Sequence, residues 1–372
     1  MNDEGYLRPV VLHKLQRSEN ARIEALCPGA RVEHGPNAVP RDPLWGPLVR
    51  SRTGAATDGA VRRQGSSGGV ISALAIFLLE SKKVDFVAQI AASTSDPLAN
   101  ELQLSYSAED VLRAAGSRYG PSAPLRQMRE LLGSGKRFAF VGKPCDVAAL
   151  RRYMQTDPAI SQQIPYLLSF ICAGVPSLEG THKVIEKLGA DRTQLASFRY
   201  RGDGWPGMAR AVQQDGQVFE MDYSTSWGTI LNRHLQFRCK ICPDGTGEFA
   251  DVTCADAWYG KDGYPDFAER DGRSMVLSRS EAGEALVREA VAAGAITVED
   301  LGVGEIAKMQ PYQAERKKMV LGRVMATRLA LGFAPRYRRL GLWRSSLMVS
   351  PLAWLKNAGG TYRRIHRSLK TT

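Results

Sequence analysis

The pattern of apolar and polar positions predicts alternating helices and strands between residues 65 and 180. Apolar residues at i, i+1, i+4, i+7 and i+8 from Val70 to Leu78 predict a helix with one buried face. Short apolar runs between glycine, proline or charged residues predict strands instead. The expected strands cover 84–90, 138–141 and 166–171, and two further helices are expected over 122–132 and 148–153. This alternation favours an α/β core.

After residue 180 the pattern changes. Segment 199–207 is rich in glycine and indicates a loop, and Asp215-Gly216 within 212–218 predicts a β-hairpin. A helix is expected over 281–293, whereas the first 59 residues have a weak pattern with scattered prolines. The predicted fold class is therefore a mixed α/β (α+β) chain with four regions. These are an irregular segment 1–59, an α/β core 60–180, a hairpin-containing region 181–312 and a helical tail 313–372.

The net charge of +12 belongs to this tail. Residues 313–372 contain fourteen Lys or Arg and one acid, Glu315, so the rest of the chain is nearly neutral. Basic and apolar residues alternate there, which fits an anionic membrane surface or an acidic protein such as a ferredoxin. No motif supports nucleic-acid binding. A solvated helix pair packed on the body is an equally weighted alternative.

Bulk composition changes the picture only slightly. With 44% hydrophobic and 24% charged residues, the chain has enough apolar side chains for a sizeable core. Neither a secretory signal nor an apolar run of roughly 18 residues is found, so we expect a cytoplasmic protein. Six cysteines are too few for a disulfide scaffold and favour metal binding or redox chemistry.

Four of the cysteines occur in suggestive contexts. Cys239 and Cys242 form a C-x-x-C pair, a spacing that lets two thiolates hold one metal centre. Cys145 and Cys172 each follow a predicted strand, and the carboxyl ends of neighbouring strands line the ligand crevice of an α/β sheet. If those strands are neighbours, the C-x-x-C pair can complete a set of four ligands.

Other assignments compete with this one. Cys145 and Cys172 could be small core residues, although the adjacent Gly and Pro residues argue for exposed strand ends. A zinc site usually draws on two close pairs rather than two separate singletons, so an iron–sulfur centre is preferred. Cys27 and Cys254 are expected not to be ligands, with Cys254 as the possible substitute.

A glycine-rich segment, Gly65 to Gly69, opens the predicted helix at Val70. Free N–H groups at a helix start attract anions, and glycines allow a phosphate to come close. Ser66 and Ser67 add hydroxyl groups, and Arg62 adds charge. Simple capping of the helix by serine is an equally weighted interpretation.

Taken together, these segments resemble the beta subunits of coenzyme F-420 hydrogenases and dehydrogenases, a family that includes 7-hydroxymethyl chlorophyll a reductase. Five motifs occur in the family's order over roughly residues 45 to 320. They are Arg62-x-x-Gly-Ser-Ser-Gly-Gly69, Gly142-Lys-Pro-Cys-Asp146, Cys172-Ala-Gly-Val-Pro-Ser177, Cys239-x-x-Cys242-x-Asp244 and Ala250-Asp-Val-Thr-Cys-Ala-Asp-Ala-Trp258.

The resemblance implies an oxidoreductase in which electrons pass between a 4Fe-4S cluster and a flavin, FAD rather than FMN, and the flavin exchanges hydride with an organic substrate. It implies that 60–180 forms the flavin-binding core and 181–312 carries the cluster loop. The implied cluster ligands are Cys145, Cys172, Cys239 and Cys242. The implied flavin-binding residues are Arg62, Ser66, Ser67, Gly68, Gly69 and Lys143, with Lys317, Lys318 and Arg323 as alternative partners of a flavin or substrate phosphate.

Two features distinguish this chain from its expected relatives. Cys27 is the only cysteine before residue 145, so the ferredoxin-like module of many members is missing and an external donor, a ferredoxin or a partner redox subunit, is expected. The segments 204–207, 227–228 and 310–318 resemble bacterial relatives associated with surface-polysaccharide genes, which suggests a sugar or lipid-linked organic substrate. The alternatives are a coenzyme F-420-dependent reductase or dehydrogenase subunit and a zinc-stapled assembly factor without catalytic activity.

Overall fold

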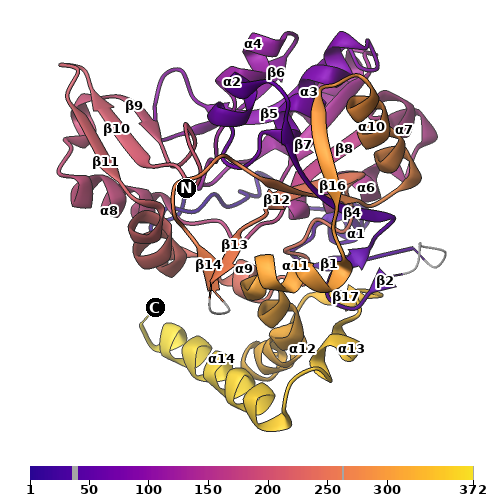
Figure 1. The fold of residues 1–372 in the computed structure, drawn as a ribbon. Coiled ribbons are helices and arrows are strands. Elements are labelled where there is room, and N and C mark those ends of the chain that lie inside the picture. Colours follow the sequence, from indigo (N-terminus) through magenta and orange to yellow (C-terminus); the bar gives the residue numbers. More distant parts are fainter. Residues whose placement is uncertain (36–40, 262–263, 372) are drawn as a thin grey trace.

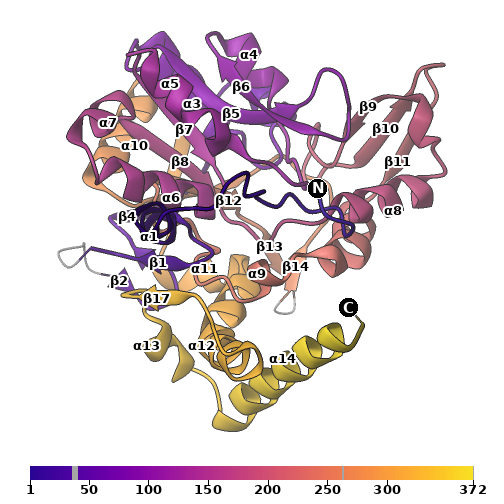
Figure 2. The same cartoon turned by 180° about the vertical axis from the view of Figure 1, so that it is seen from behind.

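A computed structural model describes residues 1–35, 41–261 and 264–371 (Figures 1 and 2). Its centre is a mixed sheet of eight strands. Four neighbouring strands, β12, β8, β7 and β5, are parallel. The flanking strands pair antiparallel with their neighbours, so that β15, β16 and β6 run opposite to the four and β4 runs in their direction. In spatial order the strands are β16 (Ile296–Asp300), β4 (Arg50–Ala56), β15 (Ser274–Ser278), β12 (Val252–Asp256), β8 (Tyr166–Phe170), β7 (Phe138–Gly142), β5 (Phe86–Ala92) and β6 (Asn100–Ser105).

Helices cover both faces of this sheet, as expected for buried parallel strands. On β7 the side chains alternate, so that Ala139 and Val141 pack into one core, while Phe138 and Phe140 pack into the other. The first core is covered by α3 (Val70–Glu80) and α10 (Glu281–Ala292). The second is covered by α5 (Met128–Gly133), α6 (Pro144–Met154), α7 (Pro158–Gln163) and α12 (Pro311–Leu331).

A smaller unit extends from one side of the sheet (Figure 1). It is a three-stranded antiparallel sheet packed with α8 (Leu178–Leu188) around a separate core that contains Val184 and Phe198. The turn at Asp215-Gly216 joins two of its strands, so the predicted hairpin is confirmed. The strands are β9 (Leu195–Arg199), β10 (Ala209–Gln213) and β11 (Val218–Met221).

The remaining elements are short apart from the last helix. The helices are α1 (Arg17–Leu26), α2 (Gly59–Gln64), α4 (Ala108–Arg113), α9 (Phe237–Lys240), α11 (Val303–Met309), α13 (Leu342–Ser346) and α14 (Pro351–Thr371). Three elements are 3-10 helices: η1 (Pro124–Gln127), η2 (Arg192–Gln194) and η4 (Leu231–His234). The element η3 (Ser224–Ile230) is a π-helix. The paired strands outside the two larger sheets are β1 (Arg31–Glu33) with β17 (Arg336–Arg338), β2 (Arg41–Asp42) with β3 (Gly46–Pro47), and β13 (Tyr259–Lys261) with β14 (Tyr264–Asp266).

The mixed α/β fold class is confirmed, and so are the helix at Val70 and the three core strands. The expectation of an irregular segment up to residue 59 is wrong, because β4 lies inside the large sheet. Its sequence, Arg-Ser-Arg-Thr-Gly-Ala-Ala, lacks an apolar run. Arg52 is nevertheless buried there through a two-point ion pair with Glu284, at 2.8 and 2.6 Å. The four region boundaries stay a prediction.

Two helix predictions need correction at their ends. The helix expected at Ala148 begins already at Pro144, because proline suits the first helical position, where no N–H is required. The helix expected from residue 122 starts as the turn η1 and becomes α-helical only at Met128. The tail is helical as predicted, and within the described residues no helix is both long and apolar enough to cross a bilayer.

Candidate functional site

The structure brings Cys145 and Cys172 to neighbouring strand ends. Strands β7 and β8 are parallel partners, with Gly142 opposite Ser169, so both chains leave the sheet on the same edge. Cys172 follows β8 after one residue, and Cys145 is the second residue of α6, directly after β7. The condition on which the four-cysteine prediction depended, that these strands are neighbours, is therefore met.

The C-x-x-C segment lies against the loop that follows β8. Pro176 pairs with Leu235 in an isolated bridge, and the Val175 N–H donates to the sulfur of Cys239 at 3.4 Å. The N–H of Cys172 donates to the carbonyl of Gly245 at 2.8 Å. Backbone contacts thus hold the distal pair next to the strand-end cysteines.

Electrostatic coupling shows which thiols lie together. Burial, together with charges at Cys239, Cys145 and Cys242, raises the pKa of Cys172 to about 12. Burial also raises the pKa of Cys254 to about 12, but without a contribution from another thiol. Cys254 lies in the core strand β12, and Cys27 is exposed at the end of α1. Cys172 therefore lies near Cys145, Cys239 and Cys242, whereas Cys254 has no such thiol neighbour, and the ligand set itself stays a prediction.

Two arginines, Arg316 and Arg238, lie beside the four thiols, and no sequence pattern indicated either position. Arg316 of α12 donates from its two terminal nitrogens to the carbonyls of Cys172, at 3.1 Å, and of Cys239. Its Nε is buried without a hydrogen-bond partner in the described structure. Burial lowers the pKa of Arg316, but the charge of neighbouring Cys242 raises it. On balance the pKa of Arg316 is raised. The guanidinium therefore stays charged beside the thiols.

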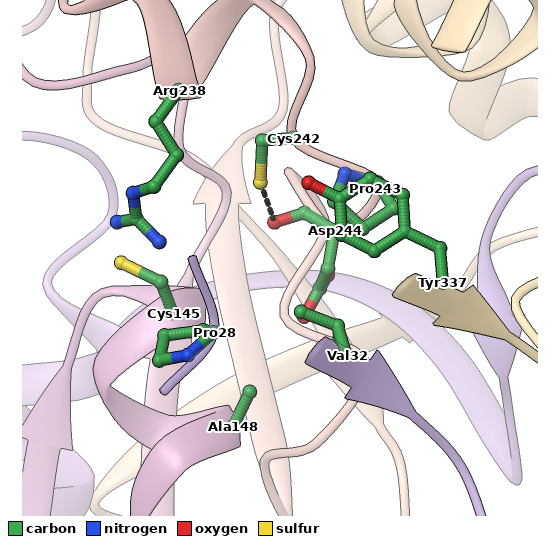
Figure 3. A pocket seen from close by; sticks show the side chains of 9 residues that line it. All are labelled: Pro28, Val32, Cys145, Ala148, Arg238, Cys242, Pro243, Asp244 and Tyr337. Atoms are coloured by element: carbon green, nitrogen blue, oxygen red, sulfur yellow. Dashed lines mark hydrogen bonds between the residues drawn. The ribbon is translucent and has the colours of Figure 1, made fainter. Parts of the chain in front are cut away.

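Arg238, the residue before Cys239, lies on the other side of the site. Figure 3 shows its guanidinium beside the sulfur of Cys145, while the sulfur of Cys242 donates to the carbonyl of Asp244 at 3.3 Å. Cys145 and Cys242 border one small pocket of about 10 Å³, room for a single water. A larger group bound by the thiols requires Arg238 to turn away from Cys145.

The donor set can be tested against two kinds of metal centre. In the part of the chain that the structure describes, no three His, Cys, Asp or Glu side chains are close enough to share one ion. A tetrahedral zinc site needs such convergence, since all four ligands bind one atom. In a 4Fe-4S cluster each thiolate binds a different iron, so the sulfurs lie further apart. Four neighbouring free thiols fit the cluster better.

A cavity of about 1100 Å³ adjoins the thiol site. Cys172 borders it, together with Ser66, Ser67 and Gly69 of the glycine-rich segment and Lys143 of the next motif. The ammonium group of Lys143 contacts Asp146 at 2.6 Å and donates to Ser122 at 2.7 Å. One cavity therefore joins the predicted phosphate-binding residues to one of the four thiols.

The predicted flavin-binding residues do not all face this cavity. Arg62 donates from Nε to the carbonyl of Gly272 at 2.8 Å and is not among the lining residues. Ser67 turns its hydroxyl to the carbonyls of Ala255 and Arg273. Gly69 caps α3 with φ +74°, a conformation that favours glycine. Ser66, whose hydroxyl accepts from Ser117 at 2.8 Å, and Lys143 thus remain as the predicted polar side chains that line the cavity.

Gly68 is required for packing. A Cβ atom there would lie 2.6 Å from the Ser274 nitrogen and 2.7 Å from the Gly54 oxygen, both backbone atoms of the sheet. We expect Gly68→Ala to lower the free energy of unfolding by about 1–3 kcal/mol, because neither strand can move freely. Guanidinium denaturation measures this.

Gly59→Ala is the matched control, since nothing lies within 4 Å of a Cβ at that helix start. Its free energy of unfolding should change by less than about 0.5 kcal/mol. Equal stability of the two variants would show that the close approach at Gly68 is not required.

An aromatic wall closes another part of the cavity. It consists of Tyr223, Trp258 and Phe267, whose ring centroids lie 4.9–5.8 Å apart. The guanidinium of Arg201 lies over two of these rings, 4.7 Å from Tyr223 and 5.0 Å from Trp258. Asp256 binds Arg201 at two points, 2.8 and 2.7 Å. A cation held by Asp256 therefore lies against an apolar wall of tilted aromatic rings at the cavity.

Lys317, Lys318 and Arg323, proposed above as alternative phosphate partners, have protein partners instead. Lys317 is buried against Glu248, and Lys318 pairs with Glu315 at 2.6 Å. Arg323 donates to the carbonyl of Lys240 at 2.9 Å. Burial alone would raise the pKa of Glu248, but Lys317 and His34 lower this pKa to about 2. These contacts fasten α12 to the segment that carries the C-x-x-C pair.

The α/β fold thus places a group of neighbouring thiols beside a large cavity, and comparison with known proteins gives the family. The family description "Coenzyme F420 hydrogenase/dehydrogenase, beta subunit N-term" matches residues 52–128. The corresponding C-terminal description matches residues 135–303. The chain belongs to the coenzyme F420 hydrogenase/dehydrogenase beta subunit family.

Curated relatives agree with this assignment. The chain is 28% identical to the coenzyme F420 hydrogenase subunit beta of Methanococcus voltae, over 66% of this chain and 82% of that one. It is 26% identical to the coenzyme F420-dependent sulfite reductase of Methanocaldococcus jannaschii, over 68% and 38%. It is 22% identical to the chloroplastic 7-hydroxymethyl chlorophyll a reductase of rice, Oryza sativa, over 59% and 45%. These relatives are redox enzymes or their subunits, so the chain is an oxidoreductase.

A solved structure supports the fold. A chain of the F420-reducing NiFe hydrogenase complex from Methanosarcina barkeri superimposes with a TM-score of 0.61 at 18% identity. The similarity covers 80% of this chain and 99% of that chain. The α/β architecture is therefore shared with this neighbour.

Proposed function

We propose that the chain is an iron–sulfur flavoprotein that exchanges hydride with a deazaflavin of the coenzyme F420 kind and single electrons with a redox partner. The observation that carries the proposal is the packing of four buried thiols beside a large cavity. Cys172 borders that cavity together with Ser66 and Lys143. A thiol-bound centre and a phosphate-bearing cofactor would therefore be neighbours.

Cys145, Cys172, Cys239 and Cys242 would hold a 4Fe-4S cluster. The start of α3 and the ammonium group of Lys143 would bind the phosphates of FAD. When bound, a flavin accepts two electrons as a hydride, and a 4Fe-4S cluster carries one electron at a time. Arg316 and Arg238 place positive charge beside the thiols, which favours the thiolate form that binds iron.

The aromatic wall gives the cavity a surface for a planar ring. Tyr223, Trp258 and Phe267 exclude water from one side, and Arg201 is held behind them by Asp256. A flat, partly apolar ring system such as an isoalloxazine or a deazaflavin packs well on such a wall. The protein would thereby orient the ring and keep water away from the transferred hydride.

Among the substrates considered, the relatives support the deazaflavin best. Two of those named above carry coenzyme F420 in their descriptions. A sugar or lipid-linked substrate for surface-polysaccharide synthesis stays a prediction. The electron partner would be a ferredoxin or a second redox subunit, because this chain carries the predicted cysteine ligands of one cluster.

Protein purified without oxygen tests the proposal. We expect a brown protein with about four irons and one FAD per chain. Reduced coenzyme F420 should bleach the flavin bands, and reduced viologen dye should convert oxidised F420 to its reduced form. A colourless protein with stoichiometric zinc would refute the iron–sulfur assignment. Flavin and iron without any exchange with F420 would instead redirect the search to another organic substrate.

A further inference from the structure

Five large apolar side chains are exposed within thirteen residues of the carboxyl-terminal tail. They lie on α13, on the connection after it and on the first turn and a half of α14, and Leu352 is 77% exposed. Figures 1 and 2 both show α13 and α14 at one end of the molecule, away from the eight-stranded sheet. We call this set the apolar patch: Trp343, Leu347, Met348, Leu352 and Leu355.

One face of helix α14 packs on α12, and the opposite face is exposed. Its inner face is fixed on α12: the ring of Trp354 packs on Gly322, and Asn357 accepts from Arg323 at 2.8 Å. Two apolar side chains further along α14 continue the row of the patch on the outer face. They are Tyr362 and Leu369, three and ten residues after Gly359, and both are exposed. The helix is thus anchored on the body with an apolar row turned outward.

Basic side chains accompany this row. Arg344, Lys356 and Arg363 are exposed on the same two helices, and Arg328 is exposed near the end of α12. From residue 316 to residue 372 the sequence contains no acidic residue. The tail therefore contributes positive charges and no side-chain carboxylate to the surface around the patch.

We propose that the apolar patch and the basic residues around it bind the surface of an anionic membrane. A helix with Trp and Leu on one side and Lys and Arg beside them lies flat at the boundary of headgroups and acyl chains. The apolar side chains enter that boundary while the basic groups meet lipid phosphates. A helix of this length is about 30 Å long, so its row of contacts can follow the plane of the bilayer.

An acidic protein is the competing occupant, and the observations favour the membrane. Five aliphatic or aromatic side chains close together in the chain have no acidic residue among them to pair with the charges of a protein partner. A fluid lipid boundary requires no such register. The inference uses none of the residues assigned to the cluster or the flavin, so it stands or falls separately from the proposed function.

Vesicle flotation of the full chain tests the proposal. With vesicles of equal parts phosphatidylglycerol and phosphatidylcholine, the chain should float at least about tenfold more efficiently than with phosphatidylcholine alone. High salt should weaken this binding. The double variant Leu352→Ser/Leu355→Ser and the double variant Lys356→Glu/Arg363→Glu should each lose binding by about tenfold.

Matched controls lie on another exposed segment. Leu12→Ser removes a side chain that is 91% exposed, and Lys14→Glu reverses an exposed charge nearby. Both control variants should float like the unchanged protein. Equal flotation of all variants, or none with anionic vesicles, would overturn the proposal. Salt-sensitive binding to an acidic ferredoxin without flotation, or a dimer that Leu352→Ser/Leu355→Ser dissociates, would also overturn it in favour of a protein partner.

Discussion

Replacing Cys172 with alanine is expected to remove nearly all iron from the anaerobically purified chain while leaving the fold intact. Cys172 couples electrostatically to the other three thiols and also borders the cavity. A cluster that loses this ligand loses the iron that the thiolate holds. Iron analysis and visible absorbance measure the loss, and far-UV circular dichroism checks the fold.

Cys254→Ala is the matched control, because this cysteine also lines the cavity and lies only one strand away. It should keep the iron of the unchanged protein, as should Cys27→Ala. Retention of iron by Cys172→Ala together with its loss from Cys254→Ala would mean that Cys254 is the fourth ligand. Loss of iron from neither would show that these cysteines hold no cluster.

The second large effect concerns the ion pair behind the aromatic wall. Asp256→Ala should lower the free energy of unfolding by about 3–5 kcal/mol, since it leaves the buried Arg201 charge without a partner. It also removes the acceptor of the Trp205 indole N–H, at 2.7 Å, and Trp205 stacks on Trp258. Denaturation followed by tryptophan fluorescence reports both changes.

An exposed ion pair gives the comparison. Glu305→Ala breaks a 2.8 Å contact with Lys308 whose side chains are 50% and 72% exposed, so its cost should stay below about 1 kcal/mol. Asp256→Asn keeps one acceptor for the indole and should fall between the two alanine variants. If Asp256→Ala costs no more than Glu305→Ala, the buried pair does not stabilise the wall.

Sequence patterns predicted the parts of the fold in which apolar spacing decides the structure. The helix at Val70 and the strands β7 and β8 are apolar on the side that packs, so their periodicity is visible. Strand β4 is different, because Arg52 is buried through Glu284, a partner more than two hundred residues away. No local pattern reveals a charge that is neutralised from such a distance.

The candidate site divides in the same way. Glycines, prolines and cysteines mark Cys145, Cys172 and the C-x-x-C pair, and the structure brings these residues together. The arginines at 316 and 238 and the pair of Arg201 with Asp256 act through contacts between distant segments. Isolated basic residues are common on protein surfaces, so the sequence cannot distinguish these buried ones from the rest.

The position of β4 has a consequence for synthesis of the chain. Its two neighbours in the sheet, β15 and β16, begin more than two hundred residues after it. At about 5–20 residues per second, a ribosome needs roughly 10–45 s to make the first of them. Strands β5 to β8 can pair with one another much earlier.

During this interval β4 has both edges open, and open strand edges associate with other chains. The nascent β4 is therefore open to association with other chains until the last third of the sequence emerges. The two family descriptions that match the chain meet between residues 128 and 135. A cut at that point would leave β4 in one piece and both of its sheet partners in the other.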